Sequence, residues 1–233
     1  MVAVGRRVLI IDADPQGNAS TGLGIAHAAR RCSIYEVIMG AAPIARATVR
    51  SAIPGLDVVP SSIDLSGAEL ELSDDEDRVY RLRRALAAVT EDYDYVLIDC
   101  PPALNLLTVN SLVAADSVIV PLQCEFFALE GLSLLMRTVE RVRKAFNPAL
   151  KIEGVVLTMV DRRNNLSGQV AADVRDYLGD TVYSTVIPRN VRVSEAPSHG
   201  KPVLLYDHRC AGSHAYIRLA REMLRREGAL QAA

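Results

Sequence analysis

Acidic residues follow two apolar runs of the sequence, and their positions suggest chemistry. Asp12 and Asp14 come directly after the run at residues 8–11, and Asp99 ends the run that begins at residue 95. In open α/β folds, ligands bind at the carboxyl ends of parallel strands. Carboxylate oxygens at neighbouring strand ends suit a Mg²⁺ ion that keeps most of its water ligands. We therefore predict a metal and phosphate site that contains these three acids.

The alternative is that the acids are structural. An acidic side chain at the end of a strand often caps the helix that follows it. For a single acid, capping is the better interpretation. Here an Asp-x-Asp-Pro stretch and a separate Ile-Asp-Cys-Pro-Pro stretch occur in one chain, and this combination favours the metal and phosphate site.

Basic residues cluster after two later apolar runs. The four arginines in question are Arg162, Arg163, Arg189 and Arg192. If both runs are strands of one parallel sheet, these side chains share its carboxyl edge and can meet phosphate groups of a nucleotide or of DNA. A solvated loop explains the same pattern equally well.

The charge of the chain is divided unevenly. Residues 1–136 carry 10 basic and 18 acidic side chains, for a net charge of −8, and residues 137–233 carry 16 basic and 10 acidic side chains, for a net charge of +6. This asymmetry suggests a basic face for nucleic acid in the second half. Helix faces of mixed charge that contact only solvent are an equally good explanation of the charge alone.

The composition indicates a globular protein of ordinary hydrophobicity. Of the 233 residues, 50% are hydrophobic and 23% are charged. No apolar run is long enough to span a membrane, and the start lacks the pattern of a secretory signal.

The four cysteines form no Cys-x-x-Cys pair, which favours reduced thiols. His208, Cys210 and His214 resemble part of a metal cluster, but they lack a second ligand pair, so chance spacing is the better interpretation.

Strands and helices are expected to alternate along the chain. We predict strands at 8–11, 56–60, 95–99, 117–121, 152–160 and 181–187, and helices at 33–39, 73–89, 104–114, 129–146, 166–178 and 212–226. The helix at 73–89 is expected to open with a capping box formed by Ser73 and Glu76. Residues 189–208 are expected to be rich in loops. This order predicts a single α/β domain with a mostly parallel sheet and helices on both faces. The last helix is basic and amphipathic, and we expect it to dock on the sheet instead of anchoring to a membrane.

Several stretches together resemble the ParA/Soj family of partitioning ATPases, a deviant-Walker group of P-loop proteins. The matching stretches are residues 8–18 (VLIIDADPQGN), 96–102 (VLIDCPP), 121–125 (PLQCE), 157–161 (LTMVD), 186–192 (VIPRNVR) and 194–202 (SEAPSHGKP). The resemblance covers nearly the whole chain. It implies a P-loop NTPase-like fold and an ATPase that uses ATP and Mg²⁺.

The resemblance also implies roles for single residues at the acidic site. Asp14 matches the residue that positions the attacking water, and Asp12 matches a residue of the Mg²⁺ shell. Asp99 matches the Walker B aspartate, which holds Mg²⁺ through water.

The later matching stretches imply binding roles. Met159, Pro188, Arg189 and Asn190 fall where the family binds the nucleotide, and Arg163 and Arg192 fall where it binds DNA without sequence preference. The family acts as a homodimer with ATP, on nonspecific double-stranded DNA, with a ParB/Spo0J-like protein that stimulates hydrolysis. We therefore expect a cytoplasmic, nucleoid-associated protein without membrane contact.

One departure from the family is large. The P-loop lies about twenty-five residues before the Asp-x-Asp-Pro-Gln stretch in the family, but no G-x-x-x-x-G-K-[ST] occurs here and the first lysine is Lys144. We expect an N-terminally truncated form that lacks the first strand and the P-loop, that leaves the neighbouring strands unpaired on one side, and that binds ATP weakly or not at all. Two alternatives remain. One is a remnant without enzymatic activity, and the other is a membrane-cycling positioning ATPase of the MinD type.

Overall fold

The computed structural model describes residues 1–161 and 163–228. The contacts within the chain separate it into two compact units. The first unit contains Met1–Asp116, Val142–Leu150 and Pro197–Lys201; the second contains Ser117–Arg141, Lys151–Ala196 and the residues from Pro202 onward. The prediction of a single domain stays a prediction.

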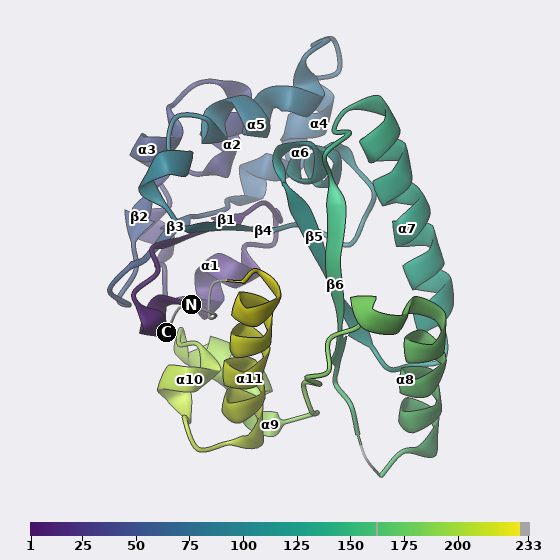
Figure 1. Ribbon diagram of the computed structural model, residues 1–233. Coiled ribbons are helices and arrows are strands. Elements are labelled where there is room, and N and C mark those ends of the chain that lie inside the picture. The colour runs from purple at the N-terminus through teal and green to yellow at the C-terminus, as the bar shows by residue number, and fades with distance from the viewer. Residues whose placement is uncertain (162, 229–233) are drawn as a thin grey trace. The chain divides into compact units, whose positions relative to one another are not determined.

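The first unit is an α/β layer structure (Figure 1). Its strands are β1 (Val8–Asp12), β2 (Val49–Arg50), β3 (Leu56–Val59) and β4 (Tyr95–Asp99). Its α-helices are α1 (Asn18–Gly22), α2 (Ile34–Met39), α3 (Ile44–Ala47), α4 (Ala68–Glu71), α5 (Arg81–Leu86) and α6 (Leu106–Ala114). Short 3₁₀ turns lie at Val2–Val4, His27–Ala29, Ile63–Gly67, Arg78–Tyr80 and Thr90–Asp92.

The sheet of this unit has the order β2-β3-β1-β4. Strand β1 runs parallel to both β3 and β4, and β2 is a short antiparallel edge strand. In Figure 1, helices α2, α5 and α6 lie above this sheet and α1 lies below it. The fold class is therefore confirmed within this unit, which has a mostly parallel sheet and helices on both faces.

The core of the first unit forms between β1 and the helices above it. Leu9 and Ile11 of β1 are fully buried, and they pack in one cluster with Ile34 and Ile38 of α2. Helix α2 begins at a capping box, in which Ser33 and Glu36 satisfy each other's backbone N–H groups. The predicted helix at 33–39 is thus confirmed, and the structure adds the capping box.

The predicted capping box at Ser73 and Glu76 is wrong. The carboxylate of Asp75 instead accepts a hydrogen bond from the backbone N–H of Asp77 at 2.9 Å and lies 2.6 Å from Nη2 of Arg81. This pairing folds the acidic run into a turn. The regular helix therefore begins only at Arg81, where α5 starts.

The second unit combines two strands with long helices. Its strands are β5 (Ser117–Gln123) and β6 (Lys151–Thr158), and its helices are α7 (Ala128–Ala145, whose last turn belongs to the first unit), α8 (Asn165–Leu178), α9 (Val191–Glu195), α10 (Val203–Tyr206) and α11 (Ala211–Arg226). Short 3₁₀ turns occur at Gly179–Thr181 and Ala196–His199. Helices α9 and α10 lie in the segment that was expected to be rich in loops.

Strand β6 buries its two faces in different cores. Val155 and Leu157 pack with residues of α7 and α8, while Val156, between them, packs with Ala215 of α11. In Figure 1, α7 and α8 lie on one side of β5 and β6 and α11 lies on the other. The predicted docking of the last helix on the sheet is confirmed. Within the described part of the chain, no helix has the length and apolar character needed to cross a membrane.

The predicted strand at 181–187 is wrong as a regular strand. The segment runs beside β6 and forms two isolated parallel bridges, Val155 with Val182 and Val160 with Pro188. Between the bridges, the N–H groups of Ser184 and Thr185 donate to the carboxylate of Glu222 at 2.7 and 2.8 Å. A side chain of α11 therefore takes the place of a strand partner.

The expectation that neighbouring strands lack a partner on one side stays a prediction. Within the described residues, β4 pairs only with β1, and β5 pairs only with β6. The apolar side chain of Leu97, in the middle of β4, is 39% exposed.

Candidate functional site

Asp12 and Asp99 occupy equivalent positions at the carboxyl edge of the first sheet. Strands β1 and β4 pair in parallel with Asp12 opposite Asp99. The backbone N–H of Ala13 continues the ladder with a 2.7 Å hydrogen bond to the carbonyl of Asp99. The structure thus brings the two acids together as the sequence predicted, because parallel pairing aligns the ends of the strands.

Asp12 also has a structural role. Its side chain is fully buried, and its Oδ2 accepts hydrogen bonds from the backbone N–H of Ser20 at 2.7 Å and from the Ser20 hydroxyl at 2.6 Å. The Ser20 hydroxyl oxygen in turn accepts a bond from the backbone N–H of Ser61 at 3.1 Å. Oδ2 of Asp12 therefore has the structural role that the alternative interpretation of the acids predicts. Oδ1 accepts a longer hydrogen bond, at 3.4 Å, from the N–H of Asp14.

Ser20 connects α1, β1 and the segment after β3, and sequence reasoning did not identify it. The polar segment after Asp14 was expected to form a loop with a short helical turn, which is α1. No motif distinguishes one serine of that segment from the next. The only signal was a small polar residue eight positions after a buried acid, and that signal is weak.

Asp14 is partly buried in a tight turn at the tip of β1. Its Oδ1 accepts a 2.9 Å bond from the backbone N–H of Gln16, and its carbonyl accepts a 2.9 Å bond from Gly17. Gly17 has φ 63°, a left-handed conformation that favours glycine. This turn holds the Asp14 carboxylate at the acidic edge, where its charge acts on Asp99.

A buried arginine supports the same turn. Arg30 is 9% exposed, and its guanidinium donates to the carbonyl of Ile25 at 2.8 and 3.1 Å and to the hydroxyl of Thr21 at 2.9 Å. A Cβ atom on Gly17 would lie 2.9 Å from Nη1 of Arg30. Arg30 therefore supports the loop after Asp14, and a side chain at position 17 would have to displace its guanidinium group. Sequence reasoning missed this residue as well.

The acidic edge carries concentrated negative charge. Partial desolvation raises the pKa of Asp99, and the neighbouring charges of Asp12 and Asp14 raise it further. The side chain of Asp99 keeps contact with solvent, which screens these charges. A bound cation would stabilise these three neighbouring negative charges.

The acids fit Mg²⁺ held mainly by water. Among the described residues, no group of three histidine, cysteine, aspartate or glutamate side chains is arranged to bind a metal directly. Mg²⁺ commonly keeps several waters and uses only one or two carboxylates. Asp99 and Asp14, with the less engaged oxygen of Asp12, would hold such an ion. Its chemistry there would be the neutralisation of phosphate charge.

Replacing Asp99 tests the repulsion at this edge. We expect Asp99→Asn to raise the thermal unfolding midpoint at pH 7, in metal-free buffer, by about 1 °C, because it removes one of three adjacent negative charges. Calorimetry measures this change. Asp92→Asn, which removes an exposed acid at the other end of β4, is the matched control. A lower midpoint for Asp99→Asn than for the control would contradict the repulsion.

The residues predicted to bind nucleotide meet at the end of β6. Met159 has φ 54°, which makes it the single non-glycine residue with positive φ in the described chain, and Val160 next to it bridges Pro188. The backbone N–H of Arg189 donates to the carbonyl of Val160 at 3.1 Å. Strained backbone of this kind concentrates at functional sites. The side chain of Asn190 has a structural role: its oxygen caps α9 by accepting a hydrogen bond from the N–H of Arg192.

The predicted basic residues are only partly brought together. Arg163 is 90% exposed and forms an ion pair with Asp161 at 3.1 Å, and its hydrogen bonds lower the pKa of Asp161, with a smaller contribution from the charge of Arg189. Arg163 is thus held by Asp161, and the positive charge of Arg189 also acts on that carboxylate. Arg162 lies outside the described residues.

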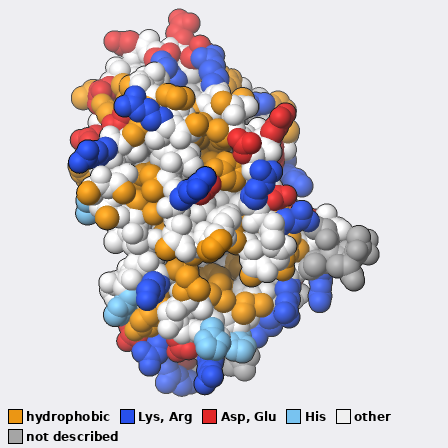
Figure 2. Space-filling view, turned by 90° about the vertical axis from the view of Figure 1, so that its left-hand side faces the viewer, with side chains coloured by type: hydrophobic (Ala, Val, Ile, Leu, Met, Phe, Trp, Pro, Cys, Tyr) orange, Lys and Arg blue, Asp and Glu red, His pale blue; other side chains and the backbone are white. Residues whose placement is uncertain are grey.

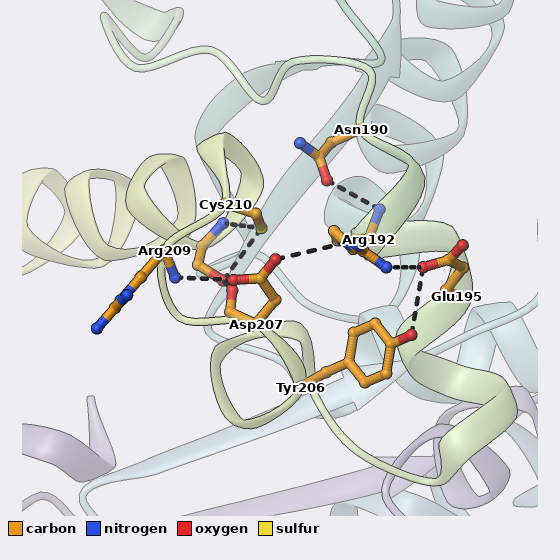
Figure 3. Close-up of polar contacts among 8 residues, drawn as sticks. Asn190, Arg192, Glu195, Tyr206, Asp207, Arg209 and Cys210 are labelled. Atoms are coloured by element: carbon orange, nitrogen blue, oxygen red, sulfur yellow. Dashed lines mark hydrogen bonds and ion pairs between the residues drawn. The ribbon is translucent and has the colours of Figure 1, made fainter.

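Arg192 belongs to a separate polar cluster (Figure 3). Its Nη1 lies 2.9 Å from Glu195, and its Nε lies 3.5 Å from Asp207. The hydroxyl of Tyr206 also donates to Glu195 at 3.2 Å. The guanidinium of Arg192 is thus oriented by two carboxylates and remains about half exposed, with 53% of the side chain accessible.

These features define the class of the protein. Parallel strands with helices on both faces and an acidic carboxyl edge give the chain the α/β fold of P-loop NTPases. The AAA domain family matches residues 1–152. The chain is 64% identical over 234 aligned residues to the chromosome partitioning protein ParA of Caulobacter vibrioides, and it covers 88% of that protein. The chain belongs to the ParA/Soj family of partitioning ATPases.

Other relatives agree with this assignment. The chain is 53% identical over 220 residues to the sporulation initiation inhibitor protein Soj of Bacillus subtilis, with 94% of this chain and 87% of Soj covered. A cobyrinic acid a,c-diamide synthase from Mycobacterium smegmatis, solved with a bound ATP analogue and magnesium, is 38% identical with a TM-score of 0.84, covering 98% of this chain and 86% of that one. The family resemblance is therefore confirmed.

The MinD resemblance is limited to the fold. The cell division ATPase MinD of Pyrococcus furiosus superposes with a TM-score of 0.78 at 23% identity, covering 96% of this chain and 87% of that one. At that identity the likeness concerns architecture alone.

Proposed function

We propose that this protein is a DNA-partitioning ATPase that binds double-stranded DNA without sequence preference as an ATP-dependent homodimer. The weak binding of ATP expected of these 233 residues, which hold no P-loop motif, stays a prediction. A ParB-type partner stimulates its hydrolysis of ATP, and the protein works in the cytoplasm on the nucleoid. Its 64% identity to a chromosome partitioning protein over the full length of this chain supports the proposal most strongly.

The acidic edge supplies the hydrolytic part of the proposal. Asp14 is held in a tight turn with one carboxylate oxygen bound by Gln16, which leaves the other to orient a water molecule. Asp12 and Asp99 would hold Mg²⁺ through its waters. Met159, Pro188, Arg189 and Asn190 would bind the nucleotide. The magnesium and the ATP analogue in the 38% identical relative support this assignment.

The exposed arginines supply the DNA-binding part. Arg163 and Arg192 expose their guanidinium groups while carboxylates hold them in place, and Arg–phosphate bonds can replace Arg–carboxylate bonds of the same geometry. Contacts with phosphates alone give binding that is independent of sequence and falls steeply with salt.

The DNA-binding role is tested by removing both arginines. We expect Arg163→Ala with Arg192→Ala to weaken the affinity for a random 30-bp duplex about tenfold or more at 0.1 M salt in millimolar Mg-ATP, because two phosphate contacts are lost. Fluorescence anisotropy measures the affinity. The control Arg137→Ala with Arg141→Ala removes the same charge from exposed positions on α7. Equal affinities for the wild type and the Arg163/Arg192 variant would refute the assignment.

A further inference from the structure

A short segment belongs to the first unit, although its neighbours in the sequence belong to the second. The segment is Pro197–Lys201; the residues before it, up to Ala196, and those after it, from Pro202, lie in the second unit. It follows α9 and lies within and just after the 3₁₀ turn that begins at Ala196. The contacts that hold these residues to the first unit therefore connect α9 with the unit that contains the acidic edge.

Two glycines make the closest of these contacts. Gly24 lies in the loop after α1, and a Cβ atom on it would lie only 2.7 Å from the carbonyl oxygen of Gly200. A Cβ atom on Gly200 would in turn lie 2.9 Å from the Cα of Gly24. Their φ angles are positive, at 76° and 60°. The two backbones can approach this closely only because neither residue has a side chain.

Hydrogen bonds connect Gly24 to the turn that holds Asp14. The N–H of Gly24 donates to the carbonyl of Thr21 at 3.0 Å, and the N–H and hydroxyl of Thr21 donate to the carbonyl of Gly17 at 3.0 and 2.9 Å. The N–H of Gly17 donates to the carbonyl of Asp14 at 2.9 Å. Arg30 supports the same loop through the Thr21 hydroxyl. A restraint on the Asp14 turn is therefore passed on to Gly24.

The 3₁₀ turn connects Gly200 to Arg192. The N–H of Gly200 donates to the carbonyl of Pro197 at 3.0 Å, and Ala196, at the start of the turn, is buried. Glu195 directly precedes Ala196 and lies 2.9 Å from Nη1 of Arg192 (Figure 3). The seated turn thus holds the carboxylate that orients the guanidinium of Arg192.

An oriented Arg192 favours a phosphate partner. A guanidinium that is already held in one geometry loses less conformational entropy when it binds. Figure 2 shows Lys and Arg side chains gathered at the lower end of the face that it displays, at the height of α9 and α10 in Figure 1. Such a surface attracts DNA, so the orientation of Arg192 affects DNA affinity.

We propose that the contact between Gly24 and Gly200 couples the acidic edge to Arg192. The segment Pro197–Lys201 has two arrangements, one seated on the loop of Gly24 and one lifted from it. Mg-ATP at the acidic edge restrains the Asp14 turn, which favours the seated arrangement and with it the oriented Arg192.

The coupling is reciprocal. DNA that binds the oriented Arg192 also favours the seated arrangement, so it raises the affinity for Mg-ATP by the same factor. The coupling rests on the proposed function and adds the contact through which its two sites communicate.

The first test compares two glycines of similar backbone conformation. We expect Mg-ATP, titrated to saturation, to raise the affinity of the wild type for a random 30-bp duplex about tenfold at 0.1 M salt, and that of Gly24→Ala less than about twofold. Gly5→Ala is the control, because Gly5 has φ 80° and a Cβ atom there meets nothing within 4 Å. Fluorescence anisotropy measures the affinities, and circular dichroism verifies folding. Equal responses of Gly24→Ala and the control would overturn the coupling.

The second test uses only the wild-type protein, so it does not depend on the folding of a variant. We expect Mg-ATP to slow the hydrogen exchange of the Gly24 and Gly200 amides about threefold or more, because the seated arrangement protects both, and the duplex to slow the same amides. NMR resolves the two glycines. Slowed exchange at Gly24 without a change at Gly200 would overturn the coupling.

The outcomes separate the coupling from the proposed function. If the Arg163/Arg192 variant loses DNA affinity but Gly24→Ala responds to Mg-ATP as the wild type does, the coupling fails and the proposed function stands. If the wild-type protein does not bind DNA under any of these conditions, the proposed function itself fails.

Discussion

Ser20→Ala is expected to lower the free energy of unfolding by about 2–3 kcal/mol. The hydroxyl of Ser20 donates to the fully buried carboxylate of Asp12 at 2.6 Å and accepts the N–H of Ser61 at 3.1 Å. Alanine removes both bonds at once. A buried carboxylate then loses one of its donors and a buried N–H loses its acceptor, and each loss carries a desolvation penalty.

Urea unfolding followed by circular dichroism measures this effect, and amide hydrogen exchange at Ser61 localises it. Ser133→Ala is the matched control, because the Ser133 hydroxyl donates only to the carbonyl of Leu129 on an exposed face of α7. We expect the control to change stability by less than 0.5 kcal/mol. An equal, small effect in both variants would show that the Asp12 carboxylate does not depend on Ser20.

Glu222→Gln is expected to lower the free energy of unfolding by about 1–3 kcal/mol. The Glu222 carboxylate accepts the N–H groups of Ser184 and Thr185 and lies 3.2 Å from Nη2 of Arg226. Glutamine keeps one oxygen and places an amide donor against a backbone donor. One N–H of the segment beside β6 then loses its acceptor. Arg226 also loses its charge-assisted contact with residue 222.

This prediction includes a dependence on pH. Burial alone would raise the pKa of Glu222, but hydrogen bonds from Thr185 and Ser184 and the charge of Arg226 outweigh burial and lower the pKa below its ordinary value of 4.5. Stability from an acid with a lowered pKa is present above the unfolded value and is lost as the pH falls through the folded value. The difference between wild type and Glu222→Gln should therefore be full at pH 7 and shrink below about pH 4.

Thermal unfolding at several pH values measures the difference, and Glu130→Gln, on an exposed part of α7, is the control. We expect the control to leave the midpoint nearly unchanged. A Glu222→Gln midpoint equal to that of the wild type at pH 7 would contradict the role of this carboxylate as the partner of residues 184 and 185.

The sequence predicted the elements whose signals are local and repeated. The apolar runs of β1 and β4, the helical spacing of α7 and the start of α2 at Ser33 were all found in the structure. Hydrophobic periodicity is the strongest signal of this kind. The alignment of Asp12 with Asp99 was also predictable, because parallel strands end at one edge.

The features that the sequence did not predict depend on contacts between distant residues. Glu222 binds two N–H groups of the segment beside β6 from 37 or 38 residues away, so this segment forms isolated bridges with β6 instead of a continuous strand. Asp75 draws Arg81 and Asp77 into a turn, which a capping-box pattern does not reveal. Ser20 and Arg30 support the acidic site through tertiary hydrogen bonds, and no spacing rule marks them.

Metal binding by the 233-residue protein tests most directly whether the acidic edge is the metal-holding part of an ATPase site. Electron paramagnetic resonance of added Mn²⁺, with Mg²⁺ as competitor, counts the bound ions. We predict one weakly held ion for each chain, displaced by Mg²⁺ and lost in a variant with Asp14→Asn and Asp99→Asn, because these carboxylates hold the ion's waters. No bound ion in the wild-type protein, or equal binding by the variant, would contradict the account.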